Sequence, residues 1–322
     1  LARFRPWVTP DGSSPQRDFL RAAGTHRVRI FRAGNQSGKT TAHVVDAALR
    51  LLGWHPCARK APPVWGWLSS LDWEFGVGQI LWPRLREYLP MSEVRSISWY
   101  RRSEPAIPHS IVFRNGSRLD LKSADAGREK YQGATLDFVG LDEEHPADVV
   151  EECRARLLKR GGDLWAVLTP VRRERWVLDL ERAHGTRVIR ATMRQAVAAG
   201  LLDRASVDAF ADSLPDRQRA VRVEGDLRRH VGPFEMDGEA GPFGGRGDEG
   251  AEAAVQIAQD LVDLRRRPVF TQRVEHGAVA GGRLQDAHRG RAHRPRPHAE
   301  EAARQVRRRA IEVVCVALHP RH

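Results

Sequence analysis

The residue types best suited to chemistry gather in one short run near the amino end of the chain, Ala33-Gly34-Asn35-Gln36-Ser37-Gly38-Lys39-Thr40. An alternating apolar run (28–31) precedes it and a helix-like run (41–52) follows, so the sequence predicts a strand, a glycine-bearing loop and a helix. The backbone N–H groups of such a loop bind phosphate oxygens, the lysine contacts the β- and γ-phosphates, and the hydroxyl binds Mg²⁺. We expect a phosphate site formed by Gly34, Asn35, Gln36, Ser37, Gly38, Lys39 and Thr40.

One position of this loop departs from the usual pattern. Its first residue is Ala33, where glycine is usual, and we expect the adjacent Gly34 to relax the turn. The alternative is a Gly/Ser surface turn that carries an incidental lysine. The flanking strand and helix favour the phosphate site over that alternative.

A second candidate stretch, residues 136–146, is a mostly apolar run that ends in Asp142-Glu143-Glu144. Opposite a phosphate loop, Asp142 would hold Mg²⁺ while Glu143 orients and deprotonates the attacking water. The separation from Lys39 fits two strands of one parallel sheet. Taken alone, these carboxylates are also typical of an exposed helix N-cap, and their pairing with the Lys39 loop favours the catalytic interpretation.

Two more segments are expected at the carboxyl edge of the sheet, where ligands bind in open α/β folds. The polar loop 122–133 carries basic groups that could reach a γ-phosphate on their own subunit or a neighbour's, with Arg128 as first choice and Lys130 as second. Ordinary solvated loop charges are the alternative. Thr169 ends the apolar run 163–170 and could sense the γ-phosphate through a hydrogen bond.

The segment before the phosphate loop contains Pro15, Gln16 and Phe19 at a predicted helix start. A Gln amide both donates and accepts hydrogen bonds, so Gln16 could bind an adenine edge. A capped surface helix explains the same residues equally well.

The order of the predicted elements indicates the fold class. Strands alternating with helices over residues 25–195 predict an α/β fold with a parallel, doubly wound central sheet. Asn115-Gly116 predicts a hairpin turn, and residues 203–227 should be helical with a break at 214–215. A chain of 322 residues is long enough for one large α/β domain and a second, smaller domain.

The composition points to an acidic polymer as partner. The net charge is +12 and the pI is about 10.6, which favours nucleic acid, although a strong arginine bias also follows from a GC-rich coding sequence. The three cysteines are widely separated, which argues against a disulfide framework or a zinc site. No apolar run is long enough to cross a bilayer, so we expect a cytoplasmic protein that is not secreted and has no membrane partner.

Together these motifs resemble the ATPase domain of the large terminase subunit of tailed bacteriophages, the motor that packages double-stranded DNA into a procapsid. The resemblance covers about residues 1–229. The pieces that carry it, in the order and spacing of that family, are Pro15-Gln16 with Phe19, the 33–40 loop, and residues 127–134, 141–144, 168–170 and 219–226.

The resemblance implies a P-loop NTPase that uses ATP and Mg²⁺. The implied roles are adenine binding by Gln16, phosphate and Mg²⁺ binding by Lys39 and Thr40, metal binding and water activation by Asp142 and Glu143, coupling by Thr169, and an arginine finger at Arg128. It also implies a homo-oligomeric ring docked on a portal protein, in the host cytoplasm at the portal vertex of the procapsid. A small terminase subunit would deliver the double-stranded DNA.

The sequence departs from this family in its last part. The family usually continues into a nuclease of the ribonuclease H type, whose two-metal chemistry needs several carboxylates on strand ends. Residues 230–322 contain no Trp, Tyr or Lys, the glycine-rich stretch 232–250 carries only scattered acids, and no apolar strand ends in Asp. We therefore expect a basic, poorly ordered region there, a degenerate, truncated or frame-shifted counterpart of the nuclease, with residual endonuclease activity left open.

Two other functions remain open from the sequence. Asp142-Glu143-Glu144-His145 spells the box of DExH-type helicases, which need a second RecA-like domain that residues 230–322 have no strand–helix alternation to build. A DNA-binding or assembly subunit that binds ATP without hydrolysing it is the second alternative.

Overall fold

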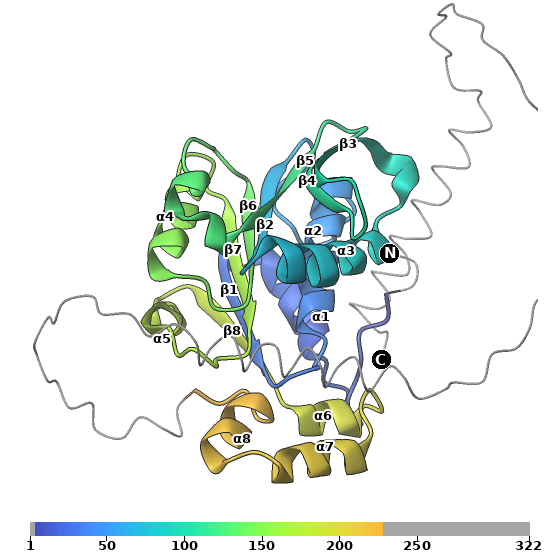
Figure 1. Ribbon diagram of the computed structural model, residues 1–322, viewed down its shortest axis with the longest axis vertical. Helices are drawn as coiled ribbons and strands as arrows, with labels where there is room; N and C mark the ends of the chain where they lie inside the picture. The colour runs from blue at the N-terminus through green and yellow to red at the C-terminus, as the bar shows by residue number, and fades with distance from the viewer. Residues whose placement is uncertain (1–3, 228–322) are drawn as a thin grey trace, which may run out of the picture. The chain divides into compact units, whose positions relative to one another are not determined.

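The structure is a computed structural model that describes residues 4–227, all within one structural unit (Figure 1). The expectation for residues 230–322 lies outside these described residues. Within the described part, no helix combines the length and the apolar character needed to span a membrane.

Eight strands form a single sheet in the order β3-β4-β5-β2-β6-β7-β1-β8. All neighbours from β5 to β8 pair in parallel, and β4 and β3 extend the sheet in antiparallel fashion. The predicted α/β fold is confirmed, as is the hairpin at Asn115-Gly116 between β4 and β5. The strands are β1 (Val28–Ala33), β2 (Trp65–Ser70), β3 (Val94–Arg101), β4 (Ile107–Phe113), β5 (Arg118–Ser123), β6 (Phe138–Asp142), β7 (Asp163–Leu168) and β8 (Thr186–Ala191).

Helices cover both faces of the sheet, because the connections between parallel strands must cross from one end of the sheet to the other. One core lies under α1, α2 and α3 and a second lies under α4 and α5 (Figure 1). The helices are α1 (Pro15–Arg21), α2 (Lys39–Leu52), α3 (Trp82–Tyr88), α4 (Ala147–Leu157), α5 (Arg175–Arg182), α6 (Met193–Ala198), α7 (Arg204–Asp212) and α8 (Asp216–Arg222), with a π-helical segment η2 (Trp73–Leu81) and the 3₁₀ turns η1 (Ala22–Gly24), η3 (Met91–Glu93), η4 (Ala124–Ala126) and η5 (Arg128–Tyr131).

The predicted helical segment 203–227 consists of α7 and α8, separated near Leu214-Pro215 as expected. Together with α6 these helices build a small third core around Met193, Val207 and Val223. The capping box of α6, in which Thr192 and Gln195 satisfy each other's backbone N–H groups, was not predicted.

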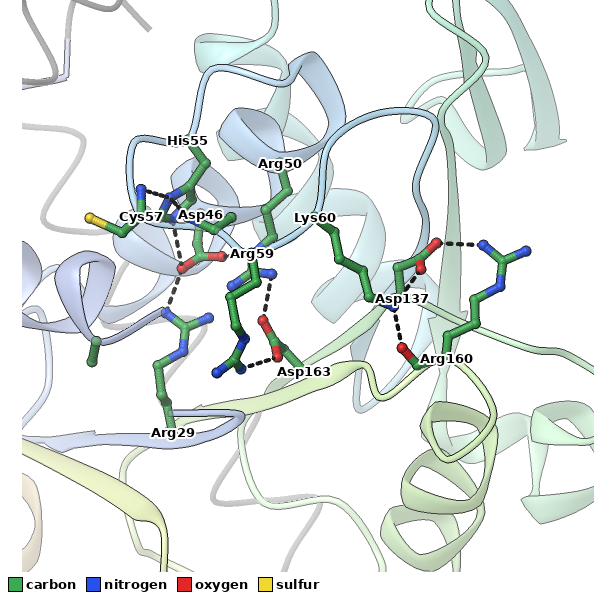
Figure 2. A network of polar contacts seen from close by, with 12 residues as sticks. Arg29, Asp46, Arg50, His55, Cys57, Arg59, Lys60, Asp137, Arg160 and Asp163 are labelled. Atoms are coloured by element: carbon green, nitrogen blue, oxygen red, sulfur yellow. Dashed lines mark hydrogen bonds and ion pairs between the residues drawn. The ribbon is translucent and has the colours of Figure 1, made fainter. Parts of the chain in front are cut away.

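Buried charges hold the sheet together at the amino ends of its central strands (Figure 2). Asp46 of α2 accepts hydrogen bonds from Arg29 of β1 at 2.6 Å and from Arg50 at 2.5 Å. Arg50 also donates to Asp163, the first residue of β7, at 2.7 Å. Because Asp46 and Arg29 are fully buried, the charge of Arg29 is compensated by Asp46, and that of Asp46 by Arg29 and Arg50.

The same network continues to β6 through the segment after α2 (Figure 2). Arg59 donates to Asp163 at 2.7 Å, and Lys60 donates to Asp137, just before β6, at 2.8 Å. Asp137 also accepts from Arg160 at 2.8 Å and from the backbone N–H of Trp65 at 2.8 Å. The charged network therefore fixes one end of the sheet, and the opposite, carboxyl end carries the candidate site.

Candidate active site

The loop expected to bind phosphate lies between a strand and a helix, as the sequence predicts. It connects β1 to α2, and two of its residues have a left-handed backbone, Gln36 with φ 54° and Gly38 with φ 79°. A Cβ atom on Gly38 would lie 2.5 Å from the side-chain nitrogen of Gln16, and the positive φ at this position also favours glycine. The N–H groups at the start of α2 have no partner within the helix and can bind an anion.

Two of the predicted loop residues use their N–H groups within the protein. The N–H of Gly34 donates to the carbonyl of Ala191 at 3.2 Å, and that of Asn35 donates to the carbonyl of Arg222 at 2.8 Å. The backbone donors that a phosphate would use therefore begin at Gln36. Gly34 and Asn35 instead attach the loop to β8 and α8.

Lys39 is buried, with 6% of its surface exposed. Its Nζ donates to the carbonyls of Ala33 and Gly34, at 3.2 and 2.9 Å, and to Thr169 Oγ1 at 2.9 Å. Burial lowers the pKa of Lys39, while the carboxylates of Glu143 and Asp142 act against that change. The ammonium group thus lies between the phosphate loop and the carboxylate pair.

Asp142 and Thr40 form a pair of oxygen ligands suited to Mg²⁺. Thr40 Oγ1 donates to Asp142 Oδ1 at 3.3 Å. Burial raises the pKa of Asp142 to about 7, with a further contribution from Glu143, against the effects of Lys39 and Thr40. Among the described residues no three His, Cys, Asp or Glu side chains gather into a metal site. Magnesium is typically bound by one or two protein carboxylates together with substrate phosphates, and this donor set fits that pattern.

Glu143, directly after β6, has an unusual backbone angle and is held by two hydrogen bonds. Its backbone is left-handed with φ 71°, its N–H donates to the carbonyl of Val167 at 2.8 Å, and its Oε2 accepts from the N–H of Thr169 at 2.9 Å. Burial raises the pKa of Glu143, although Lys39 and the N–H of Thr169 oppose the rise. A carboxylate with a raised pKa and a fixed position suits a general base.

Thr169 forms hydrogen bonds with residues of both the phosphate loop and the carboxylate pair. Besides contacting Lys39 and Glu143, its hydroxyl donates to Asn35 Oδ1 at 3.3 Å. This is possible because β7, which ends just before Thr169, lies between β6 and β1 in the sheet. The carboxyl ends of all three strands meet at one edge, so the structure brings together residues 39, 142, 143 and 169.

Gln16 contacts the backbone of the phosphate loop. Its Nε2 donates to the carbonyl of Gly38 at 2.9 Å, and its Oε1 accepts from the N–H of Trp7 at 3.1 Å. Trp7, which sequence reasoning missed, donates from Nε1 to the carbonyl of Ser37 at 3.0 Å. These contacts brace the loop, and adenine binding by the remaining hydrogen-bonding capacity of Gln16 stays a prediction.

Arg128 lies in η5, with 48% of its side chain exposed. Its Nε and Nη2 donate to Glu152 Oε1 of α4, at 3.1 and 3.0 Å. The hydrogen bond and charge of Glu152 raise the pKa of Arg128. The guanidinium is thus held on α4, and its predicted role as an arginine finger remains a prediction.

Two more residues of the site were given no role by the sequence analysis, although both belong to the acidic stretch it singled out. Glu144 accepts hydrogen bonds from the backbone N–H groups of Arg172, at 2.6 Å, and Glu174, at 3.1 Å, and so fixes the segment before α5. His145 is fully buried and bonds to the carbonyl of Glu143. The one feature of the sequence that could have identified them is their position directly after the predicted catalytic carboxylates.

The fold and the site together define a P-loop NTPase, with a phosphate loop after β1 and an Asp-Glu pair at the end of β6. The family model of the amino-terminal part of the T4-like type of terminase large subunit matches residues 30–246. The match covers more than half of the chain, and the chain belongs to this large terminase family.

Among solved structures, the chain is similar to the large terminase of a thermophilic bacteriophage in complex with ADP, at 15% identity and a TM-score of 0.48, covering 66% of this chain and 52% of that one. A second crystal form of the same phage protein gives 14% identity and a TM-score of 0.49, with 69% and 53% covered. The chain thus spans about half the length of these terminases. The comparison with curated proteins found no match.

Proposed function

We propose that this chain is the ATP-hydrolysing motor of viral double-stranded DNA packaging, with residues 1–229 as the motor domain. The observation that carries the proposal is the pair of contacts from Thr169 to Lys39 and Glu143. They connect the phosphate loop and the carboxylate pair into one site. Membership of the large terminase family supports the packaging role.

The residues present fit ATP and Mg²⁺. Lys39 and the N–H groups from Gln36 onward would hold the phosphates, while Thr40 and Asp142 would hold the metal. When bound, Mg²⁺ neutralises charge that develops on the phosphate oxygens. Because the pKa of Asp142 is raised to about 7, its carboxylate must lose its proton to serve as a ligand.

In this proposal Glu143 accepts the proton of the attacking water. One carboxylate oxygen is held by the N–H of Thr169, which leaves the other free to orient water. Charge on the γ-phosphate would be stabilised by Arg128 of a neighbouring subunit, after that side chain leaves Glu152. The site therefore implies a homo-oligomeric ring, which we place at a portal protein in the host cytoplasm, with DNA delivered by a small terminase subunit.

Coupling of hydrolysis to movement would follow a short path from the site to α8. The hydroxyl of Thr169 donates to Asn35, whose N–H donates to the carbonyl of Arg222. A Cβ atom on Gly34 would lie 2.4 Å from the carbonyl oxygen of Val223, so loop and helix end are in direct contact. We propose that loss of the γ-phosphate shifts Thr169 and thereby the α7–α8 segment that moves bound DNA.

The proposed function is tested with Lys39→Ala in the full chain. Nucleotide affinity should fall about 10- to 100-fold, because a hydrogen bond to a charged group contributes roughly 1.5–3 kcal/mol. ATP hydrolysis should be lost with it. Affinity is measured by titration with fluorescent ADP and Mg²⁺, and turnover by phosphate release with and without double-stranded DNA.

The control is Lys159→Ala, because Lys159 is an exposed lysine on the surface after α4. Both measurements should stay at the level of the unchanged protein. Nucleotide binding without turnover in the unchanged protein would favour the non-hydrolysing assembly subunit. A parallel DNA-cutting assay in Mn²⁺ tests residues 230–322, and cutting would contradict a degenerate nuclease.

The coupling path predicts a selective effect of Thr169→Val. Valine has the same shape without the hydroxyl, so the contacts with Lys39 and Asn35 are lost while the backbone contact with Glu143 remains. We expect DNA-stimulated turnover to fall roughly tenfold, in the range of typical coupling energies, with nucleotide affinity nearly unchanged. Phosphate release at increasing DNA concentration measures this.

Thr192→Val is the matched control, because Thr192 caps α6 and its removal should reduce stability by about 1 kcal/mol without changing turnover. An equal loss of DNA stimulation in both variants would argue against the path through Thr169.

A further inference from the structure

His145 lies fully buried directly behind the carboxylate pair. Its Nδ1 lies 3.1 Å from the carbonyl oxygen of Glu143, and its Nε2 lies 2.7 Å from Ser69 Oγ, near the carboxyl end of β2. Ser69 Oγ lies 2.5 Å from the hydroxyl of Tyr131 in η5. A continuous chain of hydrogen bonds thus joins η5 to the backbone of Glu143.

The direction of each hydrogen bond follows from its partners. A carbonyl oxygen only accepts, so Nδ1 of His145 carries the proton. Burial lowers the pKa of His145 to about 4, so the ring is neutral and its Nε2 accepts from Ser69. The hydroxyl of Ser69 is then the acceptor for Tyr131. Each hydrogen bond of the chain therefore has a defined donor and a defined acceptor, as expected of a fully satisfied buried network.

The end of this chain is a strained position. Glu143 is one of only three non-glycine residues with positive φ within residues 4–227, and such a backbone costs free energy unless its surroundings fix it. The hydrogen bond from His145 fixes its carbonyl, and the bond to Val167 fixes its N–H. Trp176 in turn holds the carbonyl of His145 at 2.8 Å.

The other end of the chain lies in the 3₁₀ turn that carries Arg128. Tyr131 is fully buried and packs edge-on against Trp67, with ring centroids 5.7 Å apart. Lys122 lies over the same Trp67 ring and donates to the carbonyl of Lys130 at 2.8 Å. Tyr131 thus connects η5 to Ser69 and, through Ser69, to His145.

We propose that His145 is a positioning residue for Glu143, and that with Ser69 and Tyr131 it transmits the position of η5 to the water-activating carboxylate. The inference rests on the proposed function, because it assigns His145 a role in that reaction. Engagement of Arg128 by a neighbouring subunit would then alter the placement of the general base.

The test uses a matched pair of substitutions, His145→Asn and His145→Gln. The amide nitrogen of Asn takes the place of Nδ1 and can donate to Glu143, whereas the amide of Gln reaches the place of Nε2 and keeps only Ser69. We expect His145→Gln to lower kcat roughly 10- to 100-fold at unchanged nucleotide affinity, because small displacements of a reacting group have effects of that size. His145→Asn should stay within about threefold of the unchanged protein.

Phosphate release and fluorescent-ADP titration on the full chain give these values. His55→Gln controls for stability, since only 1% of the His55 side chain is exposed but this residue belongs to the network at the opposite end of the sheet. It should lower the unfolding midpoint and leave turnover per folded molecule unchanged. Equal kcat in the two His145 variants, or a loss that follows only the folded fraction, would overturn the proposal.

Tyr131→Phe tests the far end of the relay by removing one hydroxyl. It should lower kcat less than His145→Gln and add nothing to it in the double variant, because both break the same chain. Additive effects would contradict the relay.

A readout without turnover separates this proposal from the proposed function. Amide hydrogen exchange in residues 138–146 should be faster in His145→Gln than in His145→Asn, whether or not the protein hydrolyses ATP. An unchanged protein that neither binds nucleotide nor hydrolyses it would overturn the proposed function alone. Equal exchange in the two variants would overturn the positioning role.

Discussion

Glu143→Gln is expected to lower ATP turnover roughly 10²- to 10⁴-fold, the usual contribution of a general base, while nucleotide binding is retained. The amide oxygen of Gln can still accept from the N–H of Thr169, so the local geometry is kept. The amide cannot take up a proton from water. Turnover should therefore fall although the side chain at position 143 keeps its place.

Binding should survive this substitution for an electrostatic reason. Glu143 contributes to the raised pKa of Asp142, and removing its charge lowers that pKa toward the ordinary value. Asp142 is then more fully ionised at neutral pH, which favours Mg²⁺. Single-turnover hydrolysis and fluorescent-ADP titration in Mg²⁺ measure the two effects separately.

The neighbouring carboxylate provides the control. Glu144→Gln leaves one of the two N–H groups of Arg172 and Glu174 facing an amide nitrogen, which should reduce stability by about 1–3 kcal/mol. Turnover per folded molecule should change little. If Glu144→Gln abolished turnover and Glu143→Gln did not, the roles assigned to the two carboxylates would be wrong.

Asp46→Asn is expected to reduce the free energy of unfolding by roughly 3–5 kcal/mol, the usual result of removing one partner of a buried ion pair. Arg29 would lose the carboxylate it is paired with, and Arg50 would keep only its pair with Asp163. Arg29 also has no access to water. Urea unfolding of the full chain, followed by tryptophan fluorescence at neutral pH, measures the change.

The effect should depend on pH in a defined direction. Burial alone would raise the pKa of Asp46, but Arg29 and Arg50 outweigh it and hold the pKa well below the ordinary 3.8. The carboxylate therefore stabilises the fold fully above that ordinary value, and the contribution is lost as the pH falls through the lower pKa of the folded state. The difference between the two proteins should shrink in strong acid.

A surface ion pair is the matched control for Asp46. Glu87→Gln removes the partner of Arg84 in α3, where the two side chains are 42% and 46% exposed. Such pairs contribute about 0–1 kcal/mol. A similar small loss for Asp46→Asn would mean that the buried network contributes little to stability.

The sequence by itself determined the local chemistry of this protein. The phosphate loop and the Asp142-Glu143 pair are contiguous runs, and the strands and helices beside them are visible in the same few residues. Whether these runs form a strand, a loop or a helix depends mainly on neighbours in the chain. The α/β fold class and the Asn115-Gly116 hairpin were predictable for the same reason.

Burial was harder to predict than element type. Arg29 and Arg32 lie three positions apart in β1 and so on opposite faces of the strand, and charged side chains are usually exposed. Both are buried, because Asp46 and Glu181 compensate their charges from 17 and 149 residues away. Nothing near β1 in the sequence identifies these partners.

Only the tertiary structure decided how the site is connected. The strand order places β7 between β6 and β1, which brings Thr169 to Lys39 across 130 residues of chain. The tertiary structure also decided three hydrogen bonds of the site region. They join Gln16 to the carbonyl of Gly38, Arg128 to Glu152, and His145 to the carbonyl of Glu143. The sequence selects residues with suitable chemistry, but hydrogen-bond partners depend on which strands and helices pack side by side, and that depends on the whole fold.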